Sequence, residues 1–130
     1  MAKSQSMRTP LGKVRGLGSA KSGTEHFWRQ RVTAAANLIL TAVFVVVVIA
    51  LQAGTYADVR AALANPVLNV LTIGMVVSIV WHMKIGMQVI VEDYVHTDNL
   101  KILALVANTF FCGLVGLASV VALVKIGFGA

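Results

Sequence analysis

The chain has 130 residues, of which 58% are hydrophobic and only 12% are charged. A soluble domain carries about 25% charged residues, so this composition excludes a soluble globular protein and predicts a membrane protein. The net charge of +6 does not indicate nucleic-acid binding, because most of the basic residues precede the first apolar segment: Lys3, Arg8, Lys13, Arg15, Lys21, Arg29 and Arg31.

The N-terminal segment, residues 1–31, is basic and contains a single acidic residue, Glu25. Its first 23 residues are rich in glycine, serine, lysine and arginine, which is typical of a chain without fixed structure until it binds a partner. No short apolar core or cleavage site follows, which argues against a secretory signal and leaves an organelle transit peptide as an alternative. We expect this segment in the cytoplasm, in contact with acidic lipid.

Three uncharged stretches follow, each long enough to cross a bilayer, which takes about 20 helical residues. They predict transmembrane helices at about residues 32–52, 66–91 and 102–124, the second beginning near Pro66, because proline suits a first helical turn. Backbone groups in hydrocarbon must bond within their own segment, which favours helix even over the β-branched run Val45–Ile49. The predicted fold class is an all-α membrane protein, with residues 32–130 as a three-helix membrane domain.

The connections between these helices set the expected topology. With the N-terminus inside, the first loop lies outside, the second inside and the C-terminus outside, and the first loop contains Arg60 as its one basic residue. The second link, residues 92–101, has more acidic than basic residues and gives no support of its own, so the N-terminal basic cluster decides. Residues 58–65, DVRAALAN, predict a short helical turn in the first loop.

One face of the second helix combines small residues with a histidine, at a spacing of four: Gly74, Ser78, His82 and Gly86. Small residues beside an imidazole would leave a groove for a flat, bulky cofactor such as haem, with His82 as an axial ligand to its iron. The alternative is that small residues at this spacing let two helices pack closely. An ionisable residue inside a membrane favours function by default, so both interpretations stay open.

Asp93 follows His82 by eleven residues, which returns it to nearly the same helix face, about 16 Å further along the axis. Tyr94 comes next, at the predicted membrane surface. A tyrosine there commonly anchors its ring at the interface. The functional alternative is a hydrogen bond from its hydroxyl to a ligand that enters from the membrane, such as a quinone carbonyl.

Other polar residues have mainly structural interpretations. Lys84 points away from His82 and is expected to extend toward the cytoplasmic surface, although it could pair with an anionic cofactor group or a partner subunit. Cys112 gives no metal-ligand spacing and is expected to be a small buried residue. Two stripes at a spacing of four suit helix–helix packing: Thr33, Asn37 and Thr41, and Ala104, Asn108, Cys112 and Gly116.

Two arginines precede the first predicted helix, in the sequence HFWRQRVTA, residues 26–34. Arg29 and Arg31 stand beside His26, Phe27 and Trp28, and most such residues anchor a helix at the interface. An arginine here could also bind a carboxylate, for example a haem propionate.

The sequence HMKIGMQVIVEDYVH, residues 82–96, resembles the second-helix signature of the succinate dehydrogenase hydrophobic membrane anchor subunit, the smaller, D-type cytochrome b anchor of respiratory complex II. The matching positions run from the histidine to the Asp-Tyr pair: His82, Ile85, Gly86, Gln88, Val89, Asp93 and Tyr94. The segment HFWRQRVTA, the length and the three-helix plan are also similar to the family, and the resemblance covers roughly residues 16–128.

This resemblance implies a six-helix heterodimeric anchor domain, formed with a second three-helix anchor of the cytochrome b556 type. That domain docks an iron–sulfur subunit, which carries the flavoprotein that oxidises succinate. Electrons pass from FAD through iron–sulfur clusters to ubiquinone, in the tricarboxylic acid cycle and aerobic electron transport. The resemblance makes His82 an axial ligand of haem b shared with the second anchor, makes Tyr94 and Asp93 quinone-binding, and puts Arg31 near the haem propionates or the quinone pocket.

The chain has no flavin or nucleotide motif and no cysteine cluster, so we expect a non-catalytic subunit of the oxidoreductase complex, in a bacterial inner membrane or, as the alternative, a mitochondrial inner membrane. A different function would be a small oligomeric transporter or proton-coupled antiporter, with Asp93, Lys84 and His82 as a proton relay. A third is a structural protein that only recruits partners. Fumarate reductase anchors are the nearest alternatives within the superfamily, and the sequence leaves open which quinone is used and which of His26, Arg29 and Arg31 meets a propionate.

Overall fold

The computed structural model describes residues 9–16 and 23–129, and within them it contains helices and no strand. The helices are α1 (Pro10–Val14), α2 (Gly23–Leu51), α3 (Tyr56–Ala64), α4 (Pro66–Tyr94) and α5 (Asp98–Gly127). Three of them are long and apolar enough to cross a membrane: α2, α4 and α5. The predicted all-α fold with three transmembrane helices is confirmed. The expectations for Lys3, Arg8 and Lys21 lie outside the described residues.

The long helices extend past the uncharged stretches that predicted them. Helix α2 begins at Gly23 rather than near residue 32, so His26, Arg29 and Arg31 lie inside it and do not precede it. Helix α4 continues to Tyr94, and α5 runs from Asp98 to Gly127. The reason is that absence of charge marks only the part of a helix in hydrocarbon, whereas the helical backbone continues into the interface, where charges are solvated.

Side-chain caps fix the start of α3 and α4. Asn65 accepts hydrogen bonds from the backbone N–H groups of Val67 and Leu68 (3.0 and 3.3 Å), and Pro66 fills the first position of α4. At α3, the Thr55 hydroxyl and backbone N–H both donate to the Asp58 carboxylate at 2.7 Å. Both bonds lower the pKa of Asp58 from its ordinary value, and the bond from the hydroxyl has the larger effect. The helical turn predicted at residues 58–65 is therefore part of α3, a helix with a capped start.

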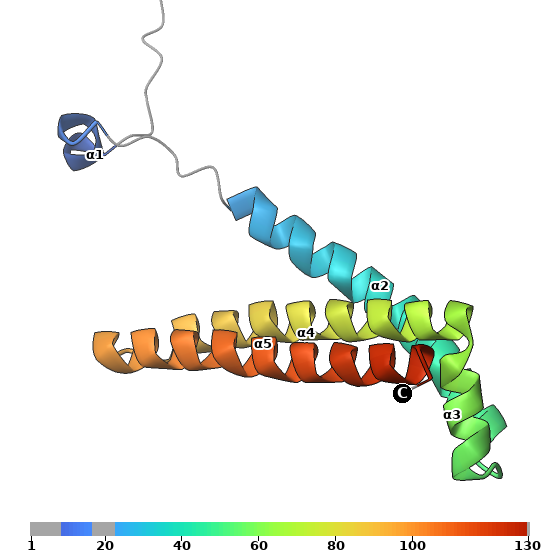
Figure 1. Ribbon diagram of the computed structural model, residues 1–130. Helices are drawn as coiled ribbons and strands as arrows, with labels where there is room; N and C mark the ends of the chain where they lie inside the picture. Colours follow the sequence, from blue (N-terminus) through green and yellow to red (C-terminus); the bar gives the residue numbers. More distant parts are fainter. Residues whose placement is uncertain (1–8, 17–22, 130) are drawn as a thin grey trace, which may run out of the picture.

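Helices α4 and α5 form an antiparallel hairpin, and the two ribbons run side by side in Figure 1. At its middle, a Cβ on Gly116 would meet Val80 Cγ1 at 3.2 Å, so the backbones approach closely there. Asn108 Nδ2 donates to the carbonyl of Lys84 at 3.0 Å, and Cys112 beside it is 1% exposed. The stripe through Asn108, Cys112 and Gly116 is thus a packing face, as predicted, and Cys112 is a small buried residue.

A second polar residue, Asn69, joins the start of α4 to the end of α5. Asn69 is buried, and its Nδ2 donates to the carbonyl of Leu63 in α3 and to that of Leu123 in α5, each at 2.9 Å. The backbone of Gly127 packs against the same amide, since a Cβ there would meet it at 3.3 Å. One side chain of α4 therefore ties three helices together.

Helix α2 is arranged differently: it packs on α4 and crosses the α4–α5 hairpin obliquely (Figure 1). An oblique crossing brings two helices together over a short length and leaves a groove on each side of the contact. The candidate site lies at this crossing.

Candidate functional site

Three polar side chains join α2 to α4 at the crossing. His82 Nδ1 of α4 lies 2.9 Å from Thr33 Oγ1 of α2, and Ser78 Oγ donates to the carbonyl of Thr33 at 3.3 Å. Ser78 is one turn before His82, so two successive turns of α4 hold the same residue of α2. The ring of His82 is thereby fixed between the helices at its Nδ1 side.

One groove of the crossing contains His82. It encloses about 670 Å³, within the range of small-molecule sites, and its lining is mostly apolar: Ala34, Asn37, Leu38, Thr41, Ala42, Val45 and His82. Most of these residues are exposed, so the groove is open on one side. The Asn37 side-chain Oδ1 is shielded and has no hydrogen-bond partner among the described residues.

A second groove, of about 650 Å³, lies on the other side of α2. Its lining includes Gly74 and Ser78 from α4, together with Trp28, Arg29, Val32, Thr33, Ala36, Val77 and Trp81. The prediction that Gly74, Ser78 and Gly86 flank one groove beside His82 is therefore wrong. Residues four apart drift by about 40° at each step, so the stripe winds around α4, and α2 lies across it.

The alternative, that these small residues only let two helices pack closely, holds for Ser78 but not for Gly74 or Gly86. Ser78 contacts α2 through its hydrogen bond, whereas a Cβ on Gly74 or Gly86 would meet nothing within 4 Å. Close backbone approach in this protein occurs instead between α4 and α5 at Gly116.

The groove of His82 fits a flat apolar ring with one metal bond. Its walls are small and aliphatic, His82 Nδ1 is engaged by Thr33, and Nε2 is the nitrogen left for a ligand bond. The Asn37 oxygen adds one shielded polar atom to the lining, without a hydrogen-bond partner among the described residues. His82 would hold a haem iron through one nitrogen, and the open side of the groove would leave room for a ligand from another chain.

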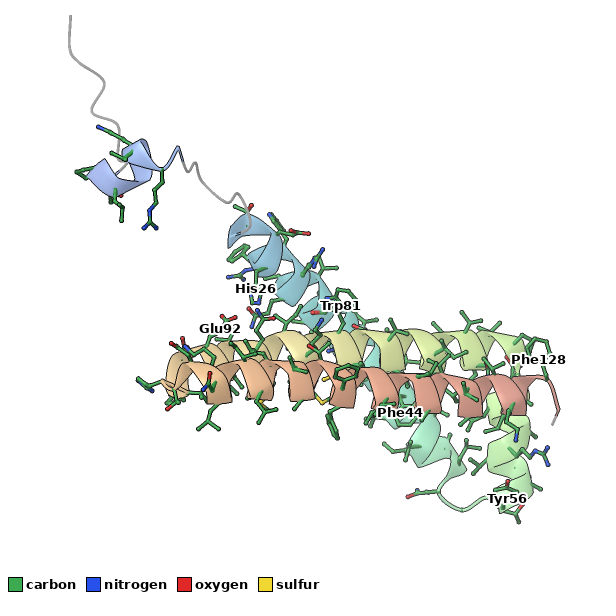
Figure 2. The ribbon with its side chains drawn as sticks, turned by 60° about the vertical axis from the view of Figure 1, so that its left-hand side comes forward. His26, Phe44, Tyr56, Trp81, Glu92 and Phe128 are labelled. Carbon is green, nitrogen blue, oxygen red and sulfur yellow. The ribbon has the colours of Figure 1, made fainter. Side chains whose placement is uncertain are left out.

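A basic pocket of about 230 Å³ lies between the first turns of α2 and the later part of α4, with Glu25, His26, Arg29, Trp81, Lys84, Ile85 and Gln88 around it. Figure 2 shows His26 beside the first turns of α2 and Trp81 near the crossing of α2 with the hairpin. Arg29 pairs with Glu25, its guanidinium carbon lies 5.8 Å from the centre of the Trp81 ring, and Lys84 Nζ lies 5.9 Å from the same ring. Lys84 therefore belongs with the basic end of α2.

The three candidates for a propionate partner are separated by the structure. His26 and Arg29 line the basic pocket, and His26 Nε2 is shielded without a partner among the described residues. Arg31 lies instead on Phe27, with its guanidinium carbon 4.1 Å from the ring centre, and lines neither groove. The sequence spacing gave no means of separating these residues, because all three were expected before the helix.

Asp93 and Tyr94 end α4 and are not brought together with His82. Both are exposed, Tyr94 to 77%, and eleven helical residues place them about 16 Å from His82 along the axis. Nearby, Gln88 donates to Glu92 at 2.8 Å and Lys101 to the Glu92 carbonyl at 3.1 Å, which joins the α4 end to α5. The residues of the proton-relay alternative are also dispersed: His82 is in its groove, Lys84 in the basic pocket and Asp93 at the exposed end.

Sequence reasoning missed two residues of the site, Thr33 and Asn37. Both were assigned to a helix-packing stripe with Thr41, and the spacing of four was the available signal. A spacing of four predicts that the residues share a helix face, but not which helix that face packs against. The structure turns it toward α4, where Thr33 bonds His82, and Asn37 and Thr41 line the same groove.

Comparisons with known proteins agree with this architecture. The family model described as succinate dehydrogenase/fumarate reductase transmembrane subunit matches residues 5–116. The succinate dehydrogenase hydrophobic membrane anchor subunit of Paracoccus denitrificans is 31% identical over 122 residues, covering 94% of this chain and 94% of that protein. The subunit of the same description from Rickettsia bellii is 28% identical over 115 residues, covering 88% of this chain and 92% of the relative.

The succinate dehydrogenase membrane anchor subunit of Reclinomonas americana is 34% identical over 91 residues, which cover 65% of this chain and 73% of that protein. No solved structure matches the chain significantly. The family match covers most of the chain, including all of α2 and α4 and their crossing. The chain therefore belongs to the family of succinate dehydrogenase and fumarate reductase transmembrane subunits, as a membrane anchor subunit.

Proposed function

We propose that this anchor binds haem b jointly with a second three-helix anchor and forms part of the ubiquinone-reduction site of a succinate dehydrogenase. The observation that carries the proposal is His82: its Nδ1 is engaged by Thr33, and the ring lines an open, mostly apolar groove. An imidazole so held has one free nitrogen for iron, and the open side of the groove leaves room for a second ligand from another chain.

In this proposal the chain's residues have separate roles. His82 would hold the haem iron through one ring nitrogen, and the small residues of α2, Ala34 and Ala42, leave space beside it. Haem, when bound, supplies a one-electron centre within the membrane. Arg29 and Lys84 supply positive charge to the basic pocket, part of it paired with Glu25, and His26 adds a ring nitrogen; this arrangement favours His26 or Arg29 over Arg31 as a propionate partner.

Tyr94 and Asp93 are proposed to line the quinone site. The end of α4 leaves both side chains exposed, so a hydroxyl donor and a carboxylate are available to the head group of a quinone whose tail stays in the bilayer. An anchor docks its soluble partner at the membrane surface, so these groups would meet the iron–sulfur subunit there. That subunit and the flavoprotein complete the proposed assembly and hold the clusters and FAD.

The proposed location is a bacterial inner membrane, with the N-terminus in the cytoplasm. The support is the concentration of lysine and arginine before and within the first turns of α2. The same orientation puts both Tyr94 and the basic pocket toward the cytoplasmic side, where the soluble subunits would dock.

The test is purification of the tagged chain from its native membrane, followed by protein identification and a reduced-minus-oxidised spectrum. We expect a flavoprotein, an iron–sulfur protein, a second anchor and a b-type haem, and we expect His82→Ala to remove that haem signal. In the same complex, Tyr94→Phe should lower quinone reduction and spare succinate oxidation with an artificial acceptor. Haem retained in His82→Ala, or quinone reduction unchanged in Tyr94→Phe, would sink the corresponding assignment.

A further inference from the structure

The hydroxyl of Thr33 lies within hydrogen-bonding distance of three atoms. Thr33 Oγ1 is 2.8 Å from the carbonyl oxygen of Arg29, 3.1 Å from that of Gln30 and 2.9 Å from His82 Nδ1. A hydroxyl has one proton to donate and two lone pairs with which to accept. The two carbonyl oxygens can only accept, so when the proton points to either of them the hydroxyl meets the imidazole with a lone pair.

From this geometry we propose that Thr33 is a positioning residue for His82. Its hydroxyl donates to the backbone of its own helix and accepts from His82 Nδ1–H, so the imidazole is held in the tautomer whose Nε2 is unprotonated. The hydrogen bond made by one ring nitrogen determines which nitrogen is free to bind a metal. This inference rests on the proposed haem function, because it concerns the same histidine.

The threonine is itself well held. Ser78 Oγ donates to the carbonyl of Thr33, so α4 contacts the backbone of Thr33 one turn away from the point where His82 contacts its side chain. The bond to the Arg29 carbonyl, or to that of Gln30, restricts the side-chain rotamer of Thr33 within α2. The acceptor oxygen therefore has a fixed position, and the plane and tautomer of the His82 ring follow from it.

A hydrogen bond at Nδ1 also affects the metal bond at Nε2. Donation from Nδ1–H makes the imidazole a stronger electron donor, and removing such an outer partner lowers metal affinity by about 10–100-fold. A stronger donor stabilises ferric over ferrous iron. Loss of the Thr33 hydroxyl should therefore weaken haem binding and raise the haem midpoint potential, by about 59 mV for each tenfold loss in the preference for ferric iron.

The experiment compares Thr33→Val with Thr33→Ser in the whole purified complex. Valine keeps the shape of threonine without the hydroxyl, and serine keeps the hydroxyl without the methyl group. We expect Thr33→Val to lose haem about 10–100-fold more readily and to have a higher haem potential, while Thr33→Ser stays near the parent in both. Thr72→Val is the matched control, because the Thr72 hydroxyl likewise donates to a backbone carbonyl of its own helix, that of Leu68 at 2.8 Å, and Thr72 lines neither groove of the crossing.

Equal haem affinity and potential in the valine and serine variants would overturn the proposal. If Thr33→Val fails to assemble, Thr33→Ala is compared with Thr33→Ser instead, and equal potentials in that pair overturn it as well. His82→Ala separates this inference from the function it rests on: haem retained without His82 rejects the haem site, whereas haem lost without His82 but unaffected by Thr33→Val rejects only the role of Thr33.

Discussion

The two helix contacts of this protein differ in how completely they satisfy their own polar groups. Along α4–α5, Asn69 and Asn108 donate to backbone carbonyls, and Gly116 receives Val80. Around α2–α4, Asn37 Oδ1 and His26 Nε2 are shielded without a partner among the described residues, and the contact has a groove on each side. A shielded polar atom left unpaired costs free energy, so native proteins seldom keep one without a reason.

This difference separates scaffold from site. Among the described residues, the shielded polar side chains between α4 and α5 are paired within the chain, and α4 carries His82 and Tyr94. The α2–α4 crossing has an open groove on each side, one of which would hold the proposed cofactor and face the proposed second chain. Variants at the α4–α5 contact should therefore change the free energy of unfolding, whereas variants at the α2–α4 crossing should change haem content.

The largest effect on stability is expected at Asn69. In Asn69→Leu the carbonyls of Leu63 and Leu123 lose their side-chain donor, which should lower the free energy of unfolding by about 1–3 kcal/mol. Thermal unfolding of the purified complex measures this, with the exposed Asn99→Leu as the control. The haem spectrum of the folded fraction should not change. An unaltered unfolding midpoint would mean that the hairpin does not depend on this amide.

A smaller loss is expected where α4 and α5 approach most closely. Gly116→Ala puts a Cβ at 3.2 Å from Val80 Cγ1, so the helices must shift slightly, at a cost of about 1 kcal/mol. Gly113→Ala is the control in the same helix, because its Cβ would meet nothing within 4 Å. The unfolding midpoints of Gly116→Ala and Gly113→Ala are compared. Equal values would show that the α4–α5 contact tolerates the added methyl group.

The smallest effect on stability is expected at Asn37, in contrast to Asn69. The Oδ1 atom of Asn37 has no partner to lose and is shielded, so Asn37→Leu should leave the free energy of unfolding unchanged or raise it, and should not lower it. Its effect should appear instead in haem content, because Asn37 lines the groove of His82. Haem content is read from the reduced-minus-oxidised spectrum. A destabilisation as large as that of Asn69→Leu, with haem intact, would contradict the distinction between scaffold and site.

Much of the fold was readable from local patterns, and the site only in part. Length and apolarity found three helices, but they missed the first nine residues of α2, because charged side chains continue a helix outside hydrocarbon. The spacing from His82 to Tyr94 identified the residues now proposed to bind haem and quinone. It did not identify Thr33 as the partner of His82, since a contact between residues 49 positions apart leaves no local spacing signal.

The sequence by itself determined that this is a membrane protein with three spanning helices, and its motif from His82 to Tyr94 indicated the family. These properties follow from composition, length and short-range spacing, which act within one helix. Only the tertiary structure decided that α2 lies across the small-residue stripe, that Gly74 and His82 face different grooves, and that Lys84 joins the basic end of α2. The physical reason is that the angle at which two helices cross depends on the shapes of both surfaces together.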